Sequence, residues 1–124
     1  MKKNIRLIAA IFNEKSEILL MKEKKAYKLP FGTINKNERL EKAYKRFIFK
    51  DTGLTVELLN IVYALNFDEI ERISIIFACV PLKKYKPTKE LPESYSWTEE
   101  NETKKLTIDF PDREILTRAY CSIK

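Results

Sequence analysis

YKLPFGTINKNERLEKAYKRFIFKDTGL, the stretch Tyr27–Leu54, is the most informative part of this chain. It combines a tight loop, Pro30-Phe31-Gly32, with one amphipathic segment that ends at Gly53. Loop-then-helix segments of this kind often carry phosphate and metal chemistry, so we look for function here first. The acidic residues that such chemistry needs are partly missing.

The pattern of this stretch predicts one helix that begins near Glu38 and ends before Gly53. Asn37 is a suitable N-cap, and Glu38 and Glu41 would complement the helix dipole in the first turn. Gly53 fits the position after the helix, where the backbone commonly turns left-handed. An apolar stripe with helical spacing would face a sheet, and it consists of Leu40, Ala43, Tyr44, Phe47 and Ile48.

Apolar and β-branched runs predict strands on both sides of this helix. We expect a hairpin of Ile5–Phe12 with Glu17–Met21, and a second antiparallel pair of Thr55–Phe67 with Arg72–Val80 across a polar turn at 68–71. An aromatic strand, one polar helical turn and a terminal helix follow at Tyr95–Trp97, within Thr98–Lys105 and from Pro111-Asp112 onward. This order indicates an α/β fold, a mixed β-sheet covered on both faces as an α/β/α sandwich.

The composition fits a single domain, which we expect to span residues 1–124, with 44% apolar residues to build its core. The apolar N-terminal run resembles a signal peptide only weakly, because Arg6 interrupts it and no small-residue cleavage site follows. Cys79 and Cys121 lack CxxC spacing, and we expect both to be structural, with Cys79 buried. Nothing suggests a disulfide framework or a membrane span, so we expect a cytoplasmic protein.

The chain contains no histidine, which excludes His-based zinc sites and Ser-His or Cys-His catalysis. Any metal would be a hard cation held by oxygen ligands. The net charge of +6 favours a phosphate-bearing partner, such as a nucleotide, although a solvated lysine-rich surface is the more common cause of such a charge. Nucleic acid is less favoured as a partner, because the chain has no helix-turn-helix pattern, zinc finger or RNP-like strand.

The spacing within Tyr27–Leu54 resembles the Nudix box, Gly-x5-Glu-x7-Arg-Glu-U-x-Glu-Glu-x-Gly-U, in which U is a bulky apolar residue. Six of the nine defined positions agree without a gap, and they are Gly32, Glu38, Arg46, Ile48, Gly53 and Leu54. Leu29-Pro30 also resembles the Leu-Pro-Gly-Gly lead-in of that family, although Phe31 replaces its first glycine. The resemblance extends over nearly the whole chain and implies a Nudix fold and a pyrophosphohydrolase that acts on nucleoside-diphosphate derivatives.

Nudix hydrolases use the box glutamates to hold Mg²⁺ or Mn²⁺ against a diphosphate and to position water for attack. Here those positions are Phe47, Lys50 and Asp51, so only Asp51 keeps a carboxylate to bind a metal. The local charge changes from about −3 to about zero, which should weaken divalent binding by several kcal/mol. The resemblance therefore implies Mg²⁺ or Mn²⁺ if hydrolysis is retained, and no cofactor otherwise. It also implies that Glu38 and Arg46 pair to fix the loop on the helix.

Two interpretations of these substitutions stay open. In the first, the site has decayed, and Lys50 forms a surface pair with Asp51 or Glu41. In the second, the Lys50 ammonium meets a phosphate oxygen directly, and the ligand binds without a divalent metal. The resemblance accordingly implies a weak or inactive pyrophosphohydrolase, and the alternative is a non-catalytic module that binds a nucleotide, RNA or a protein.

Other residues complete the candidate site. Some enzymes of this fold take a further carboxylate from the loop before the aromatic strand, which implies Glu90 and Glu93 as catalytic candidates beside Asp51. Two exposed loop glutamates are the plainer explanation, since Glu is mostly exposed. The candidate substrate-binding residues are Lys50, Arg46, Phe31 and Tyr27. The two aromatics would stack a base, although aromatics in such places more often belong to the core. The oligomeric state is open.

Overall fold

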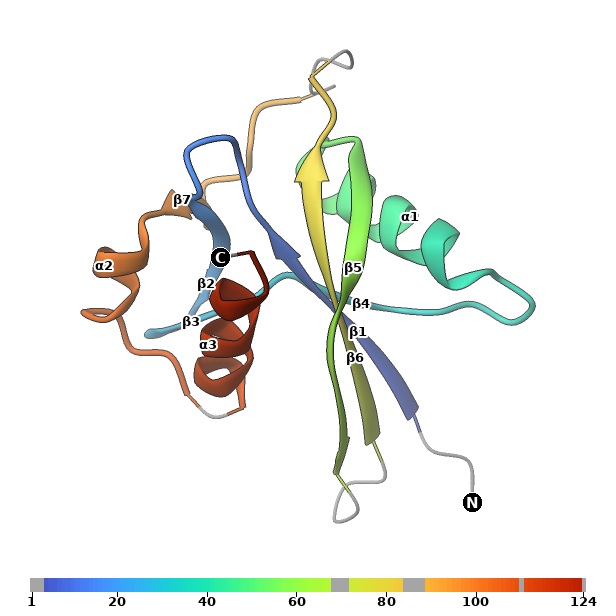
Figure 1. The fold of residues 1–124 in the computed structure, drawn as a ribbon. Helices are drawn as coiled ribbons and strands as arrows, with labels where there is room; N and C mark the ends of the chain where they lie inside the picture. The colour runs from blue at the N-terminus through green and yellow to red at the C-terminus, as the bar shows by residue number, and fades with distance from the viewer. Residues whose placement is uncertain (1–3, 68–71, 84–88, 110, 124) are drawn as a thin grey trace.

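The computed structural model describes residues 4–67, 72–83, 89–109 and 111–123. Figure 1 shows a central sheet with helices on its two sides. The elements are, in chain order, β1 (Asn4–Ile11), β2 (Ile18–Glu23), β3 (Ala26–Lys28), β4 (Phe31–Thr33), α1 (Leu40–Thr52), β5 (Val56–Phe67), β6 (Arg72–Pro81), β7 (Tyr95–Thr98), α2 (Glu100–Thr103) and α3 (Asp112–Ile123).

A mixed four-stranded sheet with the order β4-β1-β6-β5 forms the centre of the molecule. Strand β1 runs parallel to β6 and antiparallel to β4. Strands β5 and β6 pair antiparallel, which confirms the predicted second pair, while the turn predicted at 68–71 lies outside the described residues. A second, antiparallel sheet has the order β3-β2-β7.

The predicted hairpin of Ile5–Phe12 with Glu17–Met21 is wrong. Strands β1 and β2 belong to different sheets, and their segments meet at an isolated bridge between Phe12 and Ile18. The physical reason lies in β1, which pairs along both of its edges, with β4 on one side and β6 on the other. Strand β2 pairs instead with β3 and β7 in the second sheet.

Alternate side chains of β1 point to opposite faces of the sheet, as they do in any strand. Leu7, Ala9 and Ile11 pack with the buried residues of α1, whereas Ile8 and Ala10 pack with those of α3. Figure 1 accordingly shows α1 on one side of the four-stranded sheet, and α3 with the second sheet on the other. The predicted α/β/α sandwich with a mixed sheet is confirmed.

Helix α1 begins later than predicted. It starts at Leu40 with Arg39 in the N-cap position, and no side chain caps it. Asn37 is not the cap, because its backbone is left-handed with φ 64°, and Glu38 belongs to the preceding turn. The end of α1 is confirmed: Gly53 has φ 79°, and its N–H donates to the carbonyl of Phe49.

The loop predicted at Pro30-Phe31-Gly32 is partly a strand, since β4 begins at Phe31 and pairs with β1. This pairing determines which face of the sheet each of two neighbouring residues of β4 lies on. Phe31 packs with the core cluster on the α3 side, whereas Gly32 lies against Phe47 of α1. The tight approach of the chain to α1 is therefore made by Gly32.

The C-terminal elements follow the prediction. Strand β7 is the expected aromatic strand, α2 is a single helical turn, and α3 is the expected terminal helix, with Ile115, Leu116, Ala119 and Tyr120 buried on one face. Cys79 is buried as predicted, but Cys121 is exposed, so a structural role is confirmed for Cys79 alone. Among the described helices, none has the length and apolar character needed to cross a membrane.

Candidate functional site

The loop between β4 and α1 is held on the helix by Glu38 and Arg46. The Arg46 guanidinium donates from Nε to Glu38 Oε2 (2.8 Å) and from Nη2 to Glu38 Oε1 (3.0 Å). The same Nη2 donates to the carbonyl of Thr33 (2.6 Å), and the backbone N–H of Asn35 donates to Glu38 Oε1 (3.0 Å). The predicted pairing is confirmed, and it ties both ends of the loop to the middle of α1.

This network strongly favours the ionised form of Glu38. The hydrogen bonds from Arg46, and next the bond from the Asn35 backbone, lower the pKa of the Glu38 carboxyl to about 2. The Glu38 carboxylate in turn holds the pKa of the Arg46 guanidinium above its ordinary value. Because these donors of Arg46 are used inside the protein, the residue acts first as a brace for the loop.

The first box carboxylate is replaced by a core side chain. Phe47 is 4% exposed and packs against the ring of Tyr44, with 5.6 Å between the ring centroids. A Cβ atom added to Gly32 would lie only 2.5 Å from Cγ of Phe47. The phenyl ring thus fills the space between α1 and β4, where Gly32 alone leaves room for it.

The two remaining box positions differ from each other. Lys50 is exposed, whereas Asp51 is half-buried beside Tyr95, whose pKa is raised by burial and secondarily by the charge of Asp51. The predicted pair of Lys50 with Asp51 or Glu41 is wrong for the residues that the structure describes, because Glu41 pairs with Lys45 instead (2.9 Å). The Lys50 ammonium therefore has no carboxylate within ion-pair distance in the described part of the chain.

Lys89 adds a second ammonium group at this end of α1. Its Nζ donates to the backbone carbonyl of Lys50 (2.9 Å), across 39 positions of sequence. Its backbone lies against Gly53, where an added Cβ would be 3.2 Å from the Lys89 nitrogen. Sequence reasoning missed Lys89, because a contact over this distance leaves no local pattern in the sequence.

The structure places the two predicted loop carboxylates on the surface. Glu90 and Glu93 are both exposed; Glu90 follows Lys89 directly, and Glu93 lies in the turn that enters β7. Within residues 4–67, 72–83, 89–109 and 111–123, no three Asp, Glu or Cys side chains are grouped to hold a metal ion. Divalent cations of the Mg²⁺ type need several oxygen ligands, so one carboxylate beside a phenyl ring and an ammonium does not fit them.

The comparison with known protein families decides the identity of this scaffold. The NUDIX domain profile matches residues 2–119. The chain belongs to the Nudix family. Among solved structures, this Nudix chain is similar to the MutT protein from Methanosarcina mazei, at 25% sequence identity and a TM-score of 0.72, over 99% of this chain and 96% of that chain. No curated protein sequence matches it.

Two further solved structures share the Nudix fold at lower identity. An ADP-ribose pyrophosphatase from Streptococcus suis is 19% identical, with a TM-score of 0.77 over 99% of this chain and 93% of that one. The NUDIX domain of Shewanella oneidensis NrtR, complexed with ADP ribose, is 16% identical, with a TM-score of 0.69 over 100% of this chain and 90% of that one. At these identities they confirm the predicted fold and nothing finer.

The predicted base-stacking residues of this Nudix chain lie away from Lys50. Tyr27 and Phe31 pack with the core cluster beneath α3, on the other side of the sheet from α1. The guanidinium carbon of Arg6 lies 3.8 Å from the ring centroid of Phe31, and Lys22 Nζ lies 5.6 Å from that of Tyr27. Lys28 Nζ also lies 5.5 Å from the ring centroid of Phe31, so a base would have to compete with cations at both aromatics.

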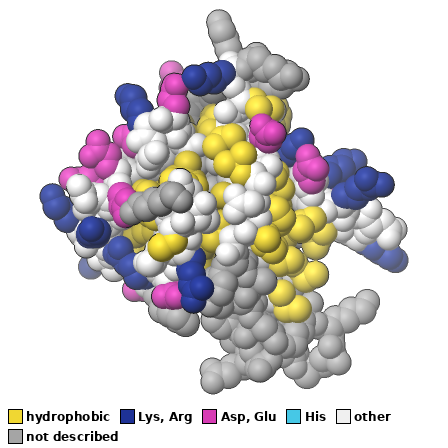
Figure 2. Space-filling model, viewed as in Figure 1, with side chains coloured by type: hydrophobic (Ala, Val, Ile, Leu, Met, Phe, Trp, Pro, Cys, Tyr) yellow, Lys and Arg dark blue, Asp and Glu magenta, His cyan; other side chains and the backbone are white. Residues whose placement is uncertain are grey.

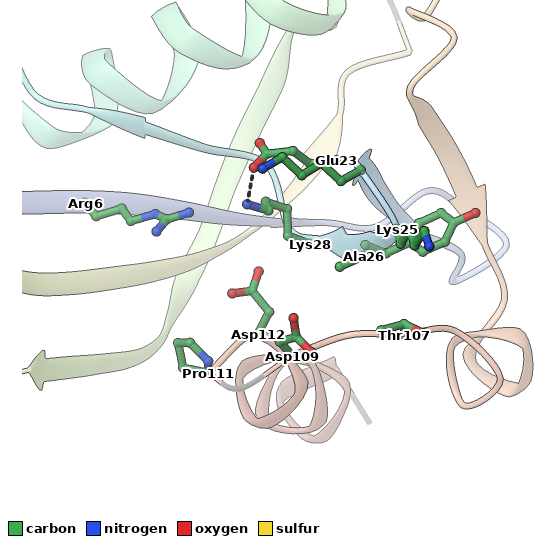
Figure 3. A pocket seen from close by; sticks show the side chains of 11 residues that line it. Arg6, Glu23, Lys25, Ala26, Lys28, Thr107, Asp109, Pro111 and Asp112 are labelled. Atoms are coloured by element: carbon green, nitrogen blue, oxygen red, sulfur yellow. Dashed lines mark hydrogen bonds and ion pairs between the residues drawn. The ribbon is translucent and has the colours of Figure 1, made fainter.

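A cavity of about 460 Å³ lies beside Tyr27, between the β2–β3 turn and the start of α3. Figure 3 shows Arg6, Lys28 and Asp112 around it, from three separate elements. Lys28 pairs with Glu23 (3.1 Å), and Asp112 accepts a hydrogen bond from the Leu29 N–H (2.9 Å). The sequence did not predict this cavity, because its walls come from segments about 80 residues apart.

Proposed function

We propose that this Nudix protein binds a nucleoside-diphosphate derivative and hydrolyses it slowly or not at all. The observation that carries the proposal is the Phe47 ring packed on Gly32, in the position of a metal-binding carboxylate. Nudix hydrolases typically use divalent metals, and Phe47 removes a ligand without leaving a space for another one. The loop brace of Glu38 and Arg46 nevertheless keeps the shape of the box.

Electrostatics supports the loss of metal binding. A dication at this face of α1 would keep the carboxylate of Asp51 and gain the repulsion of the Lys50 ammonium. At an effective dielectric near 20, each unit charge at about 4 Å changes the energy of a monovalent ion by about 4 kcal/mol, and of a dication by more. Replacing attraction by repulsion at one position therefore opposes the metal strongly.

The proposed ligand class is supported by one relative. The NUDIX domain of NrtR was solved with ADP ribose, a nucleoside-diphosphate derivative, and that domain shares this fold. The cavity beside Tyr27 is within the size range of small-molecule sites. It lies on the other side of the sheet from α1, so we do not assign it to a ligand whose phosphates lie at the box face of α1.

The proposal is tested by measuring hydrolysis and binding side by side. Phosphate release is followed from nucleoside di- and triphosphates and from ADP-ribose, with Mg²⁺ or Mn²⁺, for the wild type and for Asp51→Ala. Glu57→Gln, which alters an exposed carboxylate on β5, is the matched control. We expect a thermal shift with at least one of these compounds and no hydrolysis that depends on Asp51.

Two outcomes would contradict the proposed function. Rapid metal-dependent hydrolysis that disappears in Asp51→Ala, and also falls in Glu90→Gln or Glu93→Gln, would show an active hydrolase with its carboxylates drawn from α1 and the loop before β7. Absence of any thermal shift across the compounds would reject nucleotide binding itself.

A further inference from the structure

We infer that Lys50 and Lys89 together form a metal-independent site for a diphosphate group, at the face of α1 where Nudix hydrolases place their metal-binding glutamates. The inference rests on the proposed function, because it names the groups that hold the phosphates of the proposed ligand. Sequence reasoning supplied Lys50 for this role. The structure adds Lys89, whose ammonium donates to the backbone carbonyl of Lys50.

Lys89 is positioned by two independent contacts. The segment that carries it crosses the C-terminal end of α1, with its backbone against Gly53. Its ammonium then reaches back to the carbonyl of Lys50 at 2.9 Å. A lysine ammonium has three donors, so one donor anchors Lys89 to the helix and two stay available for phosphate oxygens.

Lys50 and Lys89 bring two ammonium groups to the C-terminal end of α1. Lys50 and Lys89 are exposed, and neither forms an ion pair with a carboxylate among the residues that the structure describes. Asp51, next to Lys50 in the chain, and Glu90, next to Lys89, carry the opposing charges. Compact ammonium groups with free donors bind phosphate as point charges.

A change at Glu90 should affect phosphate binding in the opposite direction to a change at either lysine. Its carboxylate follows Lys89 in the chain and is exposed, so it opposes an anion bound at the lysine pair. Removal of this charge in Glu90→Gln should therefore strengthen phosphate binding. If Glu90 were instead a metal ligand, the same change would weaken binding in the presence of Mg²⁺.

A helix cap is the competing explanation for Lys89. A cation at a helix C-terminus stabilises the last carbonyls, and this role requires no ligand. The two explanations predict different results. A cap would make Lys89→Gln less stable with unchanged affinity for phosphates, whereas the diphosphate site requires a loss of affinity.

The test uses inorganic pyrophosphate and the full chain, with calorimetry in EDTA. We expect binding by the wild type, about tenfold weaker binding by Lys50→Gln and by Lys89→Gln, and tighter binding by Glu90→Gln. Lys42→Gln is the matched control, since it removes the same charge from an exposed position of α1 about 12 Å along the helix from Lys50. It should bind like the wild type.

Magnesium provides the second arm of the test. Affinity for pyrophosphate in Mg²⁺ should stay within about threefold of the value in EDTA, allowing for Mg²⁺ binding to pyrophosphate itself. A strong rise of affinity with Mg²⁺, or equal affinity of wild type, Lys50→Gln and Lys89→Gln, would overturn the inference.

ADP-ribose separates this inference from the proposed function. Binding of ADP-ribose by the wild type, with no effect of Lys50→Gln or Lys89→Gln, rejects the lysine site and leaves nucleotide binding intact. Lysine-dependent binding of pyrophosphate, with no gain in affinity from the nucleoside of any compound tested, supports the lysine site and rejects nucleotide recognition.

Discussion

At the scale of single residues, Gly32 and Phe47 depend on each other. The ring of Phe47 is accommodated because position 32 has no side chain, and the approach of 2.5 Å from an added Cβ is far below van der Waals contact. A box glutamate at position 47 would be expected to reach solvent and a metal, whereas this phenyl ring is buried with Tyr44. The Phe47 ring therefore belongs to the core, at a position where the Nudix box has a glutamate.

Gly32→Ala should therefore destabilise the protein by about 1–3 kcal/mol, as overpacking of a filled core does. Urea unfolding measures this change. The same substitution in a Phe47→Ala background should cost much less, because the clashing ring is gone. Equal costs in the two backgrounds would show that Gly32 is needed for a reason other than the ring.

Glu38 predicts a dependence of stability on pH. Because the pKa of Glu38 is lowered from 4.5 to about 2 in the folded protein, its ionised form stabilises the fold above pH 4.5. That contribution is lost as the pH falls from about 4.5 toward 2. Thermal unfolding at pH 7 and at pH 3 should show Glu38→Gln several degrees less stable than the wild type at pH 7, with a smaller difference at pH 3.

Glu41→Gln is the control for this pH effect. It removes the same charge from the same end of α1, where Glu41 makes an exposed pair with Lys45. Exposed pairs contribute little to stability, so this variant should resemble the wild type at both pH values. If the difference in unfolding temperature between Glu38→Gln and the wild type were larger at pH 3 than at pH 7, the lowered pKa of Glu38 would be contradicted.

At the scale of elements, α1 shows what a periodic pattern can and cannot specify. The buried stripe and the terminal Gly53 followed from the spacing of apolar residues and from the preference of glycine for left-handed backbone. The start of the helix did not follow, because Asn37 and Glu38 have good propensities for a cap and a first turn. A tertiary interaction, the pairing of Glu38 with Arg46, takes Glu38 out of the helix.

Gly53 joins α1 to the Lys89 segment, and its replacement should affect both. Gly53→Ala should cost about 1–2 kcal/mol for the left-handed backbone alone, with a further cost because its Cβ would lie 2.8 Å from Cγ of Lys89. Gly53→Asn is the matched control, since Asn tolerates this backbone better but brings the same Cβ. Denaturant unfolding of both variants separates backbone strain from the contact with Lys89.

The incorrect prediction that β1 pairs with β2 followed from local sequence alone. Ile5–Phe12 is almost continuously apolar, and such a run is typical of a strand buried on both faces in a parallel arrangement. The short polar segment between the two strands favoured a hairpin in the prediction. Pairing of β1 with β6, which only the complete chain reveals, outweighed that local preference.

At the scale of the whole molecule, charge is distributed broadly. Figure 2 shows lysine, arginine and acidic side chains interspersed around the outline of this face, while apolar side chains gather over β5. Leu59 and Ile61 of β5 are 50% and 55% exposed. The net charge of +6 therefore acts mainly as a diffuse field, with local binding left to particular side chains.

A diffuse positive field should speed the association of anionic ligands. Raising the salt concentration from 0.05 M to 0.5 M shortens the screening length from about 14 Å to about 4 Å. Stopped-flow measurements should show the association rate of ADP-ribose falling severalfold over this range. Adenosine, which carries no phosphate, should show no such fall, and an equal salt effect on both ligands would point to a change in the protein instead.

The candidate site was predictable where its residues are close in sequence. The brace of Glu38 with Arg46 and the loss of carboxylates at Phe47 and Lys50 were visible in one stretch of box spacing. Lys89 and the cavity beside Tyr27 were not visible, because each is created by folding distant segments together. Tyr27 and Phe31 were expected near the phosphate site, yet the alternation of side chains on β4 directs Phe31 to the opposite side of the sheet.

The parallel pairing of β1 with β6 has a consequence for how the chain acquires its structure. Arg6 pairs with Ser74, so the central strand meets one of its two neighbours only after most of the chain has been made. Contacts between distant segments slow folding, because a large loop must close before they form. We expect β5 and β6, which are adjacent in sequence, to associate first and to serve as the template on which the N-terminal strand docks last. On the ribosome, the edge of β1 that pairs with β6 would stay unpaired until β6 emerges.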